Sequence, residues 1–493
     1  MSKRMPIFYS ALLLTAVNLL LRLGATGFQV YLSGRIGAAG IGLLQLVLSV
    51  SMLSMTAAMA GVRTATMYLS AEELGKGRPG NVKWVLSGCF GYSILISGGV
   101  CLGVGYFAPQ IAAYWVGDPR TETAIRLFTA FLPVSCLCGV MTGYFTAANR
   151  IGTLAAVEIA EQVFSVSITM VLLSLWVGHD PARACTAVVL GSGLGACLTL
   201  LCLLILRARE HAPTAPRIPV RHRLLETALP LALADDLKAG ISTTENLMVP
   251  KRLALFAGGV APLAAFGTVC GMVFPVLMFP AAIIYALAEL LIPELARCAA
   301  AGSRHRIRYL VGRSLRICML YGCFFCGLMF LCARGLCLRL YDSQLAGHYL
   351  RLYAPMIPML YCDAITDAMT KGLGQQKACV RYNILTSGMD VAFLYLLLPK
   401  YGMQGYLLSF FVTHLINFLL SLNRLLKITG KQLPLKIPLL GGLCTIGSIF
   451  AVSGVQDTIA RCLCYPVILS CLLFLCGILR KEDLRWMKGL VRL

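Results

Sequence analysis

Long apolar segments follow one another along almost the whole chain. Most of them are continuous, do not alternate with polar residues, and reach the roughly 20 residues that a helix needs to cross a hydrocarbon core of about 30 Å. The pattern therefore predicts an all-α polytopic membrane protein with fourteen transmembrane helices. The predicted spans are residues 7–32, 38–62, 84–108, 123–147, 154–177, 184–207, 224–249, 261–291, 309–333, 348–370, 378–399, 402–426, 436–454 and 459–479.

The composition and the placement of charge agree with this class. Of 493 residues, 58% are hydrophobic and 13% charged, whereas soluble proteins have about a quarter charged residues. The net charge of +22 invites a nucleic-acid interpretation, but the basic residues gather in every second loop, as cytoplasmic loops do. We predict a multi-pass cell-membrane protein with both termini cytoplasmic, basic loops that meet anionic lipids and no nucleic-acid partner.

The loops and a weak internal repeat predict the domain organisation. Arg22 and Arg35 are thirteen residues apart, as are Lys238 and Lys251 six spans later, and an offset of six spans keeps the orientation in the membrane. This favours two parallel halves around a central path, joined by a proline-rich linker. The predicted parts are a six-helix lobe at 1–208, a cytoplasmic linker at 209–223, a pseudo-symmetric six-helix lobe at 224–430, and two extra helices with a basic cytoplasmic tail at 431–493.

The start of the chain also bears on topology. Met1 to Arg4 is basic and leads into an apolar run, which resembles a signal peptide. The run is too long for the apolar part of a typical signal peptide and contains Arg22, so we predict an uncleaved first helix.

Three predicted spans carry polar stripes at helical spacing. A charged side chain deep in a bilayer costs several kcal/mol, about 3 or more, unless it faces protein or water. Wet faces on the first, second and seventh spans therefore predict a cleft between the two halves. The stripes are Thr15, Asn18, Arg22, Thr26 and Gln29 in the first span; Gln45, Ser49, Thr56 and Arg63 in the second; and Asp235, Lys238, Ser242 and Glu245 in the seventh.

Two basic residues at matching positions of the repeat suggest an anion site. Arg22 and Lys238 would face each other across the cleft, and a diphosphate suits such a pair, because Arg binds it in a bidentate manner and Lys as a point charge. The alternative is that Asp235 and Glu245 neutralise Lys238, and that Arg22 pairs with an acid of a neighbouring helix. The predicted substrate-binding residues are Arg22, Lys238, Asn18, Gln29, Arg63, Ser242 and Glu245.

Acidic residues in the second half are candidates for ion coupling. Asp390 lies deep in its span, whereas helix caps or intrahelical ion pairs are the simpler explanation for Asp363 and Asp367. Asp235, Asp236 and Asp390 are therefore the predicted ion-coupling residues, with Na⁺ or H⁺ as the coupled ion and no other cofactor expected.

Enzymatic and metal-dependent functions find little support. No nucleophile–base arrangement or phosphate-binding loop is present, and the six His are dispersed, with only His414 inside a span, where an interhelical hydrogen bond is the ordinary explanation. The 21 Cys lie mostly in apolar spans, where free Cys packs as a small apolar residue. We interpret Cys323 and Cys326 as packing residues and expect no disulfide framework, no metal site and no enzyme.

Several short motifs together resemble the stage V sporulation protein B group of the multidrug/oligosaccharidyl-lipid/polysaccharide exporter superfamily. The resemblance covers essentially the whole chain. Its motifs are Arg22-Leu-Gly, Arg35-Ile-Gly-Ala-Ala-Gly-Ile-Gly-Leu, Gly61-Val-Arg, Ala71-Glu-Glu, Glu161-Gln, Glu245-Asn-Leu-Met-Val-Pro-Lys-Arg-Leu, Gly271-Met-Val-Phe-Pro-Val-Leu-Met-Phe-Pro and Leu291-Ile-Pro-Glu-Leu.

This resemblance implies two six-helix lobes around a central cavity, plus two extra helices. We expect the two extra helices to offer a lateral groove for a lipid tail. It implies flipping of a polyprenyl-diphosphate-linked sugar by alternating access. In the related lipid II flippases a basic residue of the first helix matches Arg22, and a sodium site matches Asp235 or Asp236 together with Asp390. The chain departs from the group at Ala147-Ala148, where the group tends to have glycine, and in its Asp235-Asp236 pair.

The sequence thus predicts a monomeric flippase that moves a lipid-linked oligosaccharide, or a cell-wall or spore-cortex precursor, from the cytoplasmic to the outer leaflet. One alternative is a drug/cation antiporter of the same superfamily, although the first span carries a base rather than the acid expected of a proton-coupled first lobe. Another is a non-transporting membrane factor in spore-envelope assembly, in which the polar stripes would serve helix packing.

Overall fold

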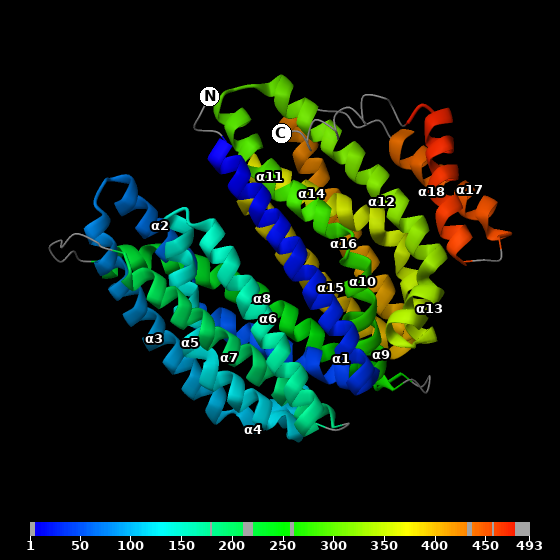
Figure 1. Cartoon of the computed structure of the whole chain (residues 1–493). Coiled ribbons are helices and arrows are strands. Elements are labelled where there is room, and N and C mark those ends of the chain that lie inside the picture. Colours follow the sequence, from blue (N-terminus) through cyan, green and yellow to red (C-terminus); the bar gives the residue numbers. More distant parts are fainter. Residues whose placement is uncertain are drawn as a thin grey trace. The chain divides into compact units, whose positions relative to one another are not determined.

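The chain is almost entirely helical (Figure 1). This computed structural model describes residues 5–177, 180–210, 220–256, 261–430, 436–455 and 458–478. The predicted all-α membrane class is confirmed: seven described helices are long and apolar enough to cross a membrane, and an eighth segment qualifies if the bent pair Pro262–Met278 and Ala281–Ala300 is one span. Most of the predicted linker, the basic tail beyond residue 478 and Met1 to Arg4 lie outside the described residues.

The helices form two compact units. The first comprises Met1–Ala254 and Gly259–Gly267, and the second Leu255–Gly258 and Thr268–Leu493. The main helices of the first unit are α1 (Met5–Met59), α2 (Val62–Gly75), α3 (Val82–Tyr106), α5 (Glu122–Ala147), α6 (Ile151–Leu172), α7 (Pro181–Ala208), α8 (Arg221–Leu253) and the short α9 (Pro262–Phe266). Those of the second are α11 (Ala281–Ala300), α12 (Arg304–Tyr341), α13 (Gln344–Tyr353), α14 (Ile357–Gly372), α15 (Gln376–Tyr401), α16 (Met403–Thr429), α17 (Lys436–Ser453) and α18 (Thr458–Leu475).

The first two predicted spans lie in one continuous element, α1. Its two parts join at Gly37, whose φ of 67° and ψ of 180° are not helical and belong to a region that essentially only glycine adopts. The second part approaches α9 so closely that a Cβ on Gly42 would lie 2.2 Å from the Leu263 carbonyl oxygen. The described helices are consistent with fourteen crossings. Helix α1 contains two of the predicted spans, and α8 and α15 correspond to two further predicted spans that are polar.

Helix α8 packs within the first unit, against α1 and α2. At its beginning Arg223 forms ion pairs with Glu72 at 2.5 Å and with Glu73 at 3.1 Å. In the sequence repeat α8 opens the second half, yet by its contacts it belongs with the first. A helix can begin one repeat in sequence and pack on the other in space, so the predicted lobe boundaries stay a prediction.

Gly61, in one of the family-like motifs, is where α2 meets α8. It has a φ of 70°, and an added Cβ would lie 2.5 Å from the carbonyl oxygen of Ala228. The added Cβ is fixed to the backbone of Gly61, and the Ala228 oxygen belongs to the backbone of α8. Neither atom could therefore move away by rotation of a side chain. Gly77 has the same φ of 70° but open space around it, which separates the effect of conformation from that of contact.

We therefore expect Gly61→Ala to lower the free energy of unfolding by more than about 1 kcal/mol, because it adds a clash to an unfavourable φ. Gly77→Ala carries the conformational cost alone and should lower it less. Thermal unfolding of the two purified variants in detergent, followed by tryptophan fluorescence, tests this difference. Equal midpoints would show that the close approach of α2 to α8 contributes nothing to stability.

The two extra C-terminal helices pack on α12 within the second unit (Figure 1). The Tyr465 hydroxyl of α18 donates a hydrogen bond to the Cys323 carbonyl of α12 at 3.0 Å. A disulfide joins Cys332 of α12 to Cys462 of α18, so the expectation that the cysteines serve packing alone misses this pair. Cys323 and Cys326 are free cysteines, buried and half-buried respectively.

Candidate functional site

Arg22 lies half-buried on the first part of α1, which packs on α6 and α7. Gln162 of α6 donates a hydrogen bond to the Leu21 carbonyl at 3.0 Å. The Thr26 hydroxyl donates to the Arg22 carbonyl at 2.9 Å, so this member of the stripe bonds to its own helix. Gln29 is half-buried, and the Asn18 side chain lies outside the described part of the structure.

Arg63 opens α2 and is exposed. It is close enough to half-buried Glu158 of α6 for the two charges to attract. Glu161, which precedes Gln162 on α6, accepts a hydrogen bond from Thr199 of α7 at 2.7 Å. The polar residues of α6 therefore position α1 and α7 while Glu158 balances Arg63.

The polar stripe of α8 contains both exposed and contact-making residues. Asp235, Lys238 and Ser242 are exposed, and Glu245 is half-buried. Beside this stripe, Asn246 donates a hydrogen bond to the Ser49 hydroxyl of α1 at 3.0 Å, which fixes the rotation of α8. At its beginning α8 forms ion pairs through His222 and Arg223. Neutralisation of Lys238 by Asp235 and Glu245 stays the alternative prediction for this stripe.

Arg22, Arg63 and Lys238 thus lie on three helices of one packed unit. The sequence placed Lys238 in the second lobe, opposite Arg22. A diphosphate clamp of Arg22 and Lys238 stays a prediction, as do the roles of the other stripe residues. Asp236 is half-buried, and its negative charge interacts electrostatically with the Tyr92 side chain of α3.

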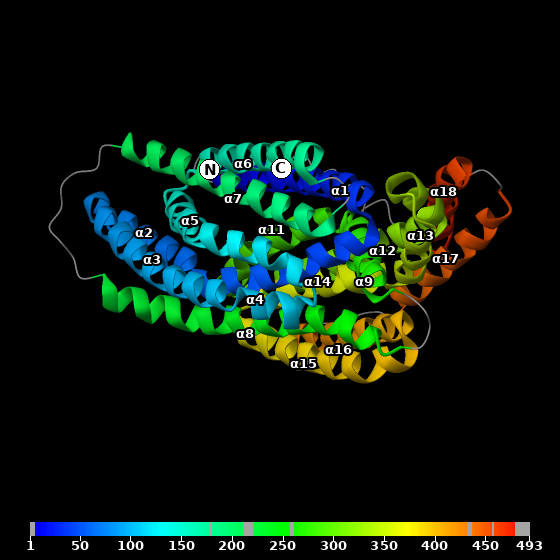
Figure 2. The same cartoon turned by 90° about the horizontal axis from the view of Figure 1, so that it is seen from below.

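Asp390, the deepest predicted ion-coupling residue, lies in the second unit on α15. Its carboxylate accepts hydrogen bonds from two hydroxyls of α16, Ser409 at 2.5 Å and Thr413 at 3.3 Å. Figure 2 shows α15 and α16 side by side. The arrangement is a small set of oxygen atoms around one carboxylate, which suits a hard cation or a proton.

A second acid of this unit is paired across helices. Asp363 of α14 is buried, accepts a hydrogen bond from Asn417 of α16 at 3.1 Å, and lies 3.6 Å from Nδ1 of His414. The cap or intrahelical pair expected for Asp363 is therefore wrong, because its partners come from another helix. Asp367 does form the expected intrahelical pair, with Lys371 at 2.6 Å.

Polar residues recur every four residues along α16. This spacing is the sequence signal for the partners of Asp363 and Asp390. Ser409, Thr413, Asn417 and Ser421 are all buried and lie along one face of the helix. Because small hydroxyl and amide side chains also serve ordinary helix packing, the stripe alone does not reveal which acid each one meets.

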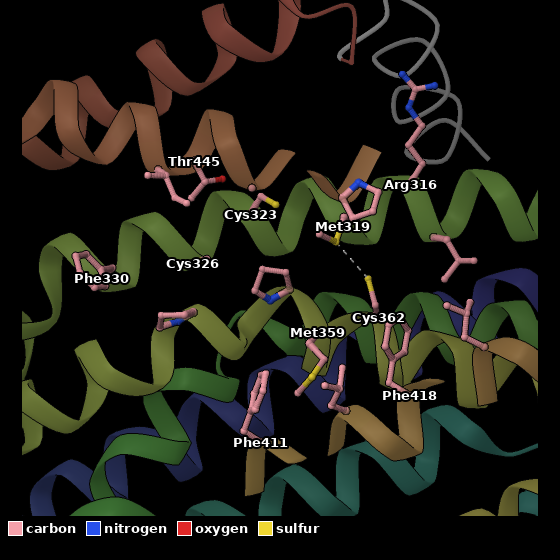
Figure 3. A pocket seen from close by; sticks show the side chains of 18 of the residues that line it. Arg316, Met319, Cys323, Cys326, Phe330, Met359, Cys362, Phe411, Phe418 and Thr445 are labelled. Carbon is pink, nitrogen blue, oxygen red and sulfur yellow. Dashed lines mark hydrogen bonds between the residues drawn. The ribbon is translucent and has the colours of Figure 1, made fainter. Parts of the chain in front are cut away.

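A long groove of about 1320 Å³ runs through the second unit between α12, α14, α16 and α17 (Figure 3). Its wall is mostly apolar and includes Met319, Phe330, Met359, Phe411 and Phe418. Among the described residues, the charged side chains that line it are Arg313, Arg316 and Arg351. Arg351 stacks on Phe330, with 4.4 Å between the guanidinium carbon and the ring centre.

Residues 81–475 match the family model of the lipid II flippase MurJ. The chain belongs to the MurJ family. The match covers most of this MurJ-family chain and includes α8, the groove helices and Asp390. The family is one of transporters rather than of catalytic enzymes, and its substrate is a lipid-linked glycan.

Similar proteins agree with this assignment. Over 443 residues the chain is 23% identical to the stage V sporulation protein B of Bacillus subtilis (strain 168), covering 86% of this chain and 84% of that protein. A structure of the lipid II flippase MurJ in an inward closed conformation aligns with a TM-score of 0.73 and 11% identity, over 95% of this chain and 100% of the other. An inward-facing multidrug resistance MATE transporter of the MOP superfamily aligns with a TM-score of 0.64 and 14% identity, over 91% and 100%.

Proposed function

We propose that this MurJ-family chain flips a polyprenyl-diphosphate-linked glycan from the cytoplasmic to the outer leaflet by alternating access. The observation that carries the proposal is the groove between α12, α14, α16 and α17. It is apolar along its length, and its described charged residues are all arginines. An acidic lining would suit a cationic drug, whereas this one suits an apolar chain attached to an anionic group.

The polar part of the substrate would bind elsewhere, at the wet faces of the first unit. Arg22 and Lys238 bind the diphosphate, and Asn18, Gln29, Arg63, Ser242 and Glu245 contact it or the sugars. The prenyl tail occupies the groove of the second unit. Apolar burial of about 0.8 kcal/mol per methylene makes the tail a large part of the binding free energy.

The relatives support a proposal for the substrate class. One is a lipid II flippase and another a stage V sporulation protein, so we propose a cell-wall or spore-cortex precursor. The chain acts as a monomer in the cell membrane, with both termini cytoplasmic and with anionic lipids at its basic loops. We propose that it acts as a transporter and not as an enzyme.

Reconstitution tests the proposal. The purified chain is placed in vesicles that contain a fluorescent polyprenyl-diphosphate disaccharide, and the labelled lipid that reaches the outer leaflet is quenched by an impermeant reagent. We expect faster quenching than in protein-free vesicles. No acceleration, together with increased drug sensitivity and unchanged glycan in a deletion strain, would favour the antiporter instead.

We further propose that a cation bound at Asp390 is coupled to flipping, with Asp235 and Asp236 as further candidates in the first unit. Asp390→Asn keeps the hydrogen bonds with Ser409 and Thr413 feasible but removes the charge. We expect it to slow flipping roughly 10-fold, since a hydrogen bond to a charged group contributes about 1.5–3 kcal/mol.

Replacing sodium by choline distinguishes the two coupled ions. If Na⁺ binds at Asp390, wild-type flipping slows in choline and Asp390→Asn is insensitive to the exchange. If H⁺ is the ion, wild-type flipping is the same in both salts. Wild-type rates of flipping by Asp390→Asn in both salts would contradict a coupling role for this residue.

A further inference from the structure

The groove of the second unit has arginines at both of its ends. Along α12 its lining runs from Arg313 and Arg316 to Phe330 (Figure 3), and Arg351 of α13 lies over the Phe330 ring. The stretch from Arg313 to Phe330 corresponds to about 25 Å of helix at 1.5 Å per residue, which is most of a hydrocarbon core of about 30 Å. A lipid tail along the groove therefore brings its head group to one of two ends that carry arginine.

The arginines near the beginning of α12 bind to the chain itself. Arg316 donates a hydrogen bond to the Ile478 carbonyl, and Arg308, two turns earlier, donates to the Thr429 carbonyl at 2.8 Å. These bonds hold the end of α16 and the segment after α18 against α12. Because these guanidinium groups serve the packing of the unit, the opposite end of the groove is the better place for an anionic ligand.

Arg351, at that opposite end, is held in place with its donors available. Its guanidinium carbon lies 4.4 Å from the centre of the Phe330 ring, and the residue is exposed. Within the described residues, no carboxylate forms an ion pair with it. A guanidinium that lies over an aromatic ring can still donate with its in-plane N–H groups, and these are the groups that bind a phosphate in a bidentate manner.

A second arginine lies close to Arg351. Arg334 is exposed and follows Phe330 by one turn of α12. Its backbone packs on α13, since a Cβ on Gly347 would lie 3.0 Å from the Arg334 Cα, and Gly347 precedes Arg351 by one turn. Because side chains lean toward the beginning of their own helix, those of Arg334 and Arg351 lean toward each other along this antiparallel pair.

We propose that Arg334 and Arg351 form an exit site, which holds the diphosphate of the flipped lipid while its tail still lies in the groove. Two guanidinium groups at the end of an apolar groove match the two phosphates and the prenyl chain of one molecule. With the predicted topology α12 begins at the cytoplasmic side, so its junction with α13 reaches the outer leaflet. The inference rests on the proposed flippase function and adds to it a phosphate site that acts after Arg22 and Lys238.

Photocrosslinking locates the diphosphate without transport. The purified chain in detergent is mixed with a polyprenyl diphosphate that carries a diazirine in the isoprene unit next to the phosphates, and the labelled peptides are identified by mass spectrometry. We expect labelling between Phe330 and Arg351. The Arg334→Ala, Arg351→Ala double variant should reduce it roughly 10-fold, because it removes hydrogen bonds to a charged group. Labelling that is absent there in the wild type, or unchanged in the double variant, overturns the inference.

Arg339→Ala is the matched control. Arg339 is another exposed arginine near the end of α12, but it lies five residues after Arg334 and thus about 140° around the helix from it. Its replacement removes the same charge from the same region and should leave the labelling at the wild-type level. A loss equal to that of the double variant would show that only the net charge matters, and would overturn a defined site.

Competitors identify the ligand. Unlabelled polyprenyl diphosphate should abolish the labelling, whereas phosphatidylglycerol at the same concentration should have little effect. Equal competition by phosphatidylglycerol would show a site for any anionic lipid and overturn its assignment to the diphosphate. Inorganic diphosphate should compete weakly because it lacks the tail, and competition as strong as that of the lipid would overturn the link between the site and the groove.

Flipping in vesicles separates this inference from the function on which it rests. We expect the double variant to flip the lipid roughly 10-fold more slowly than the wild type, and a wild-type rate would overturn a place for the site in transport. If the wild type flips the lipid and the junction of α12 and α13 stays unlabelled, the exit site is wrong and the flippase stands. If the junction is labelled in a chain that does not flip the lipid, the flippase is overturned instead.

Discussion

Replacement of Arg22 by alanine should slow the flipping of a polyprenyl-diphosphate disaccharide roughly 100-fold or more. A guanidinium forms two parallel hydrogen bonds with a phosphate, and each bond to a charged group contributes about 1.5–3 kcal/mol. Arg22 is half-buried on α1, so water replaces these bonds poorly. The rate is measured in reconstituted vesicles, alongside Lys238→Ala, for which we expect a smaller loss because Lys238 is exposed.

Two comparisons make this result specific. Lys83→Ala removes an exposed positive charge at the beginning of α3, far along the sequence from either residue, and should flip lipid at the wild-type rate. Arg22→Lys keeps the charge without the planar fork and should recover part of the activity. Unchanged flipping in the Arg22→Ala, Lys238→Ala double variant would exclude a diphosphate role for both residues.

Filling the groove of the second unit should have a comparable effect by a different route. Gly442 of α17 lines the groove, and a Cβ added there meets no atom within 4 Å. Gly442→Phe therefore places a ring in the groove without disturbing the packing of α17. If the ring displaces three methylenes of a bound tail, the loss is about 2.4 kcal/mol, or roughly 50-fold in affinity.

The length of the lipid distinguishes this effect from general damage. Gly442→Phe should slow a long-chain polyprenyl substrate strongly and a short-chain analogue little. Gly454→Phe is the control, because Gly454 also has open space but does not line the groove. Equal slowing of the long and short substrates would show that the groove does not hold the tail.

The two units have different roles in the proposed transport. The first carries the cations on α1, α2 and α8, and the second carries the groove, the buried Asp363 of α14 and the half-buried Asp390 of α15. Arg223 ties the beginning of α8 to α2, and Asn246, in its last third, ties it to Ser49 of α1. Helix α8 is therefore held to the first unit at two levels.

The sequence by itself determined the membrane class, the helical content and the family. These properties depend on the length and continuity of apolar segments, which are local, and on short motifs such as Gly61-Val-Arg. The prediction of an ion-coupling role for Asp390 also arose in this way, because its depth in a span follows from the same pattern. Apolar length sets whether a segment crosses a bilayer, whatever its neighbours are.

Only the tertiary structure decided which side chains meet. It paired His414 with Asp363, enclosed Asp390 with two hydroxyls of α16, joined Cys332 to Cys462 across 130 residues, and packed α8 with the first unit. Helical periodicity defines the face on which a residue lies but not the helix that covers that face. Contacts between distant segments arise when whole helices pack, so the partners of each polar residue appear only in the folded chain.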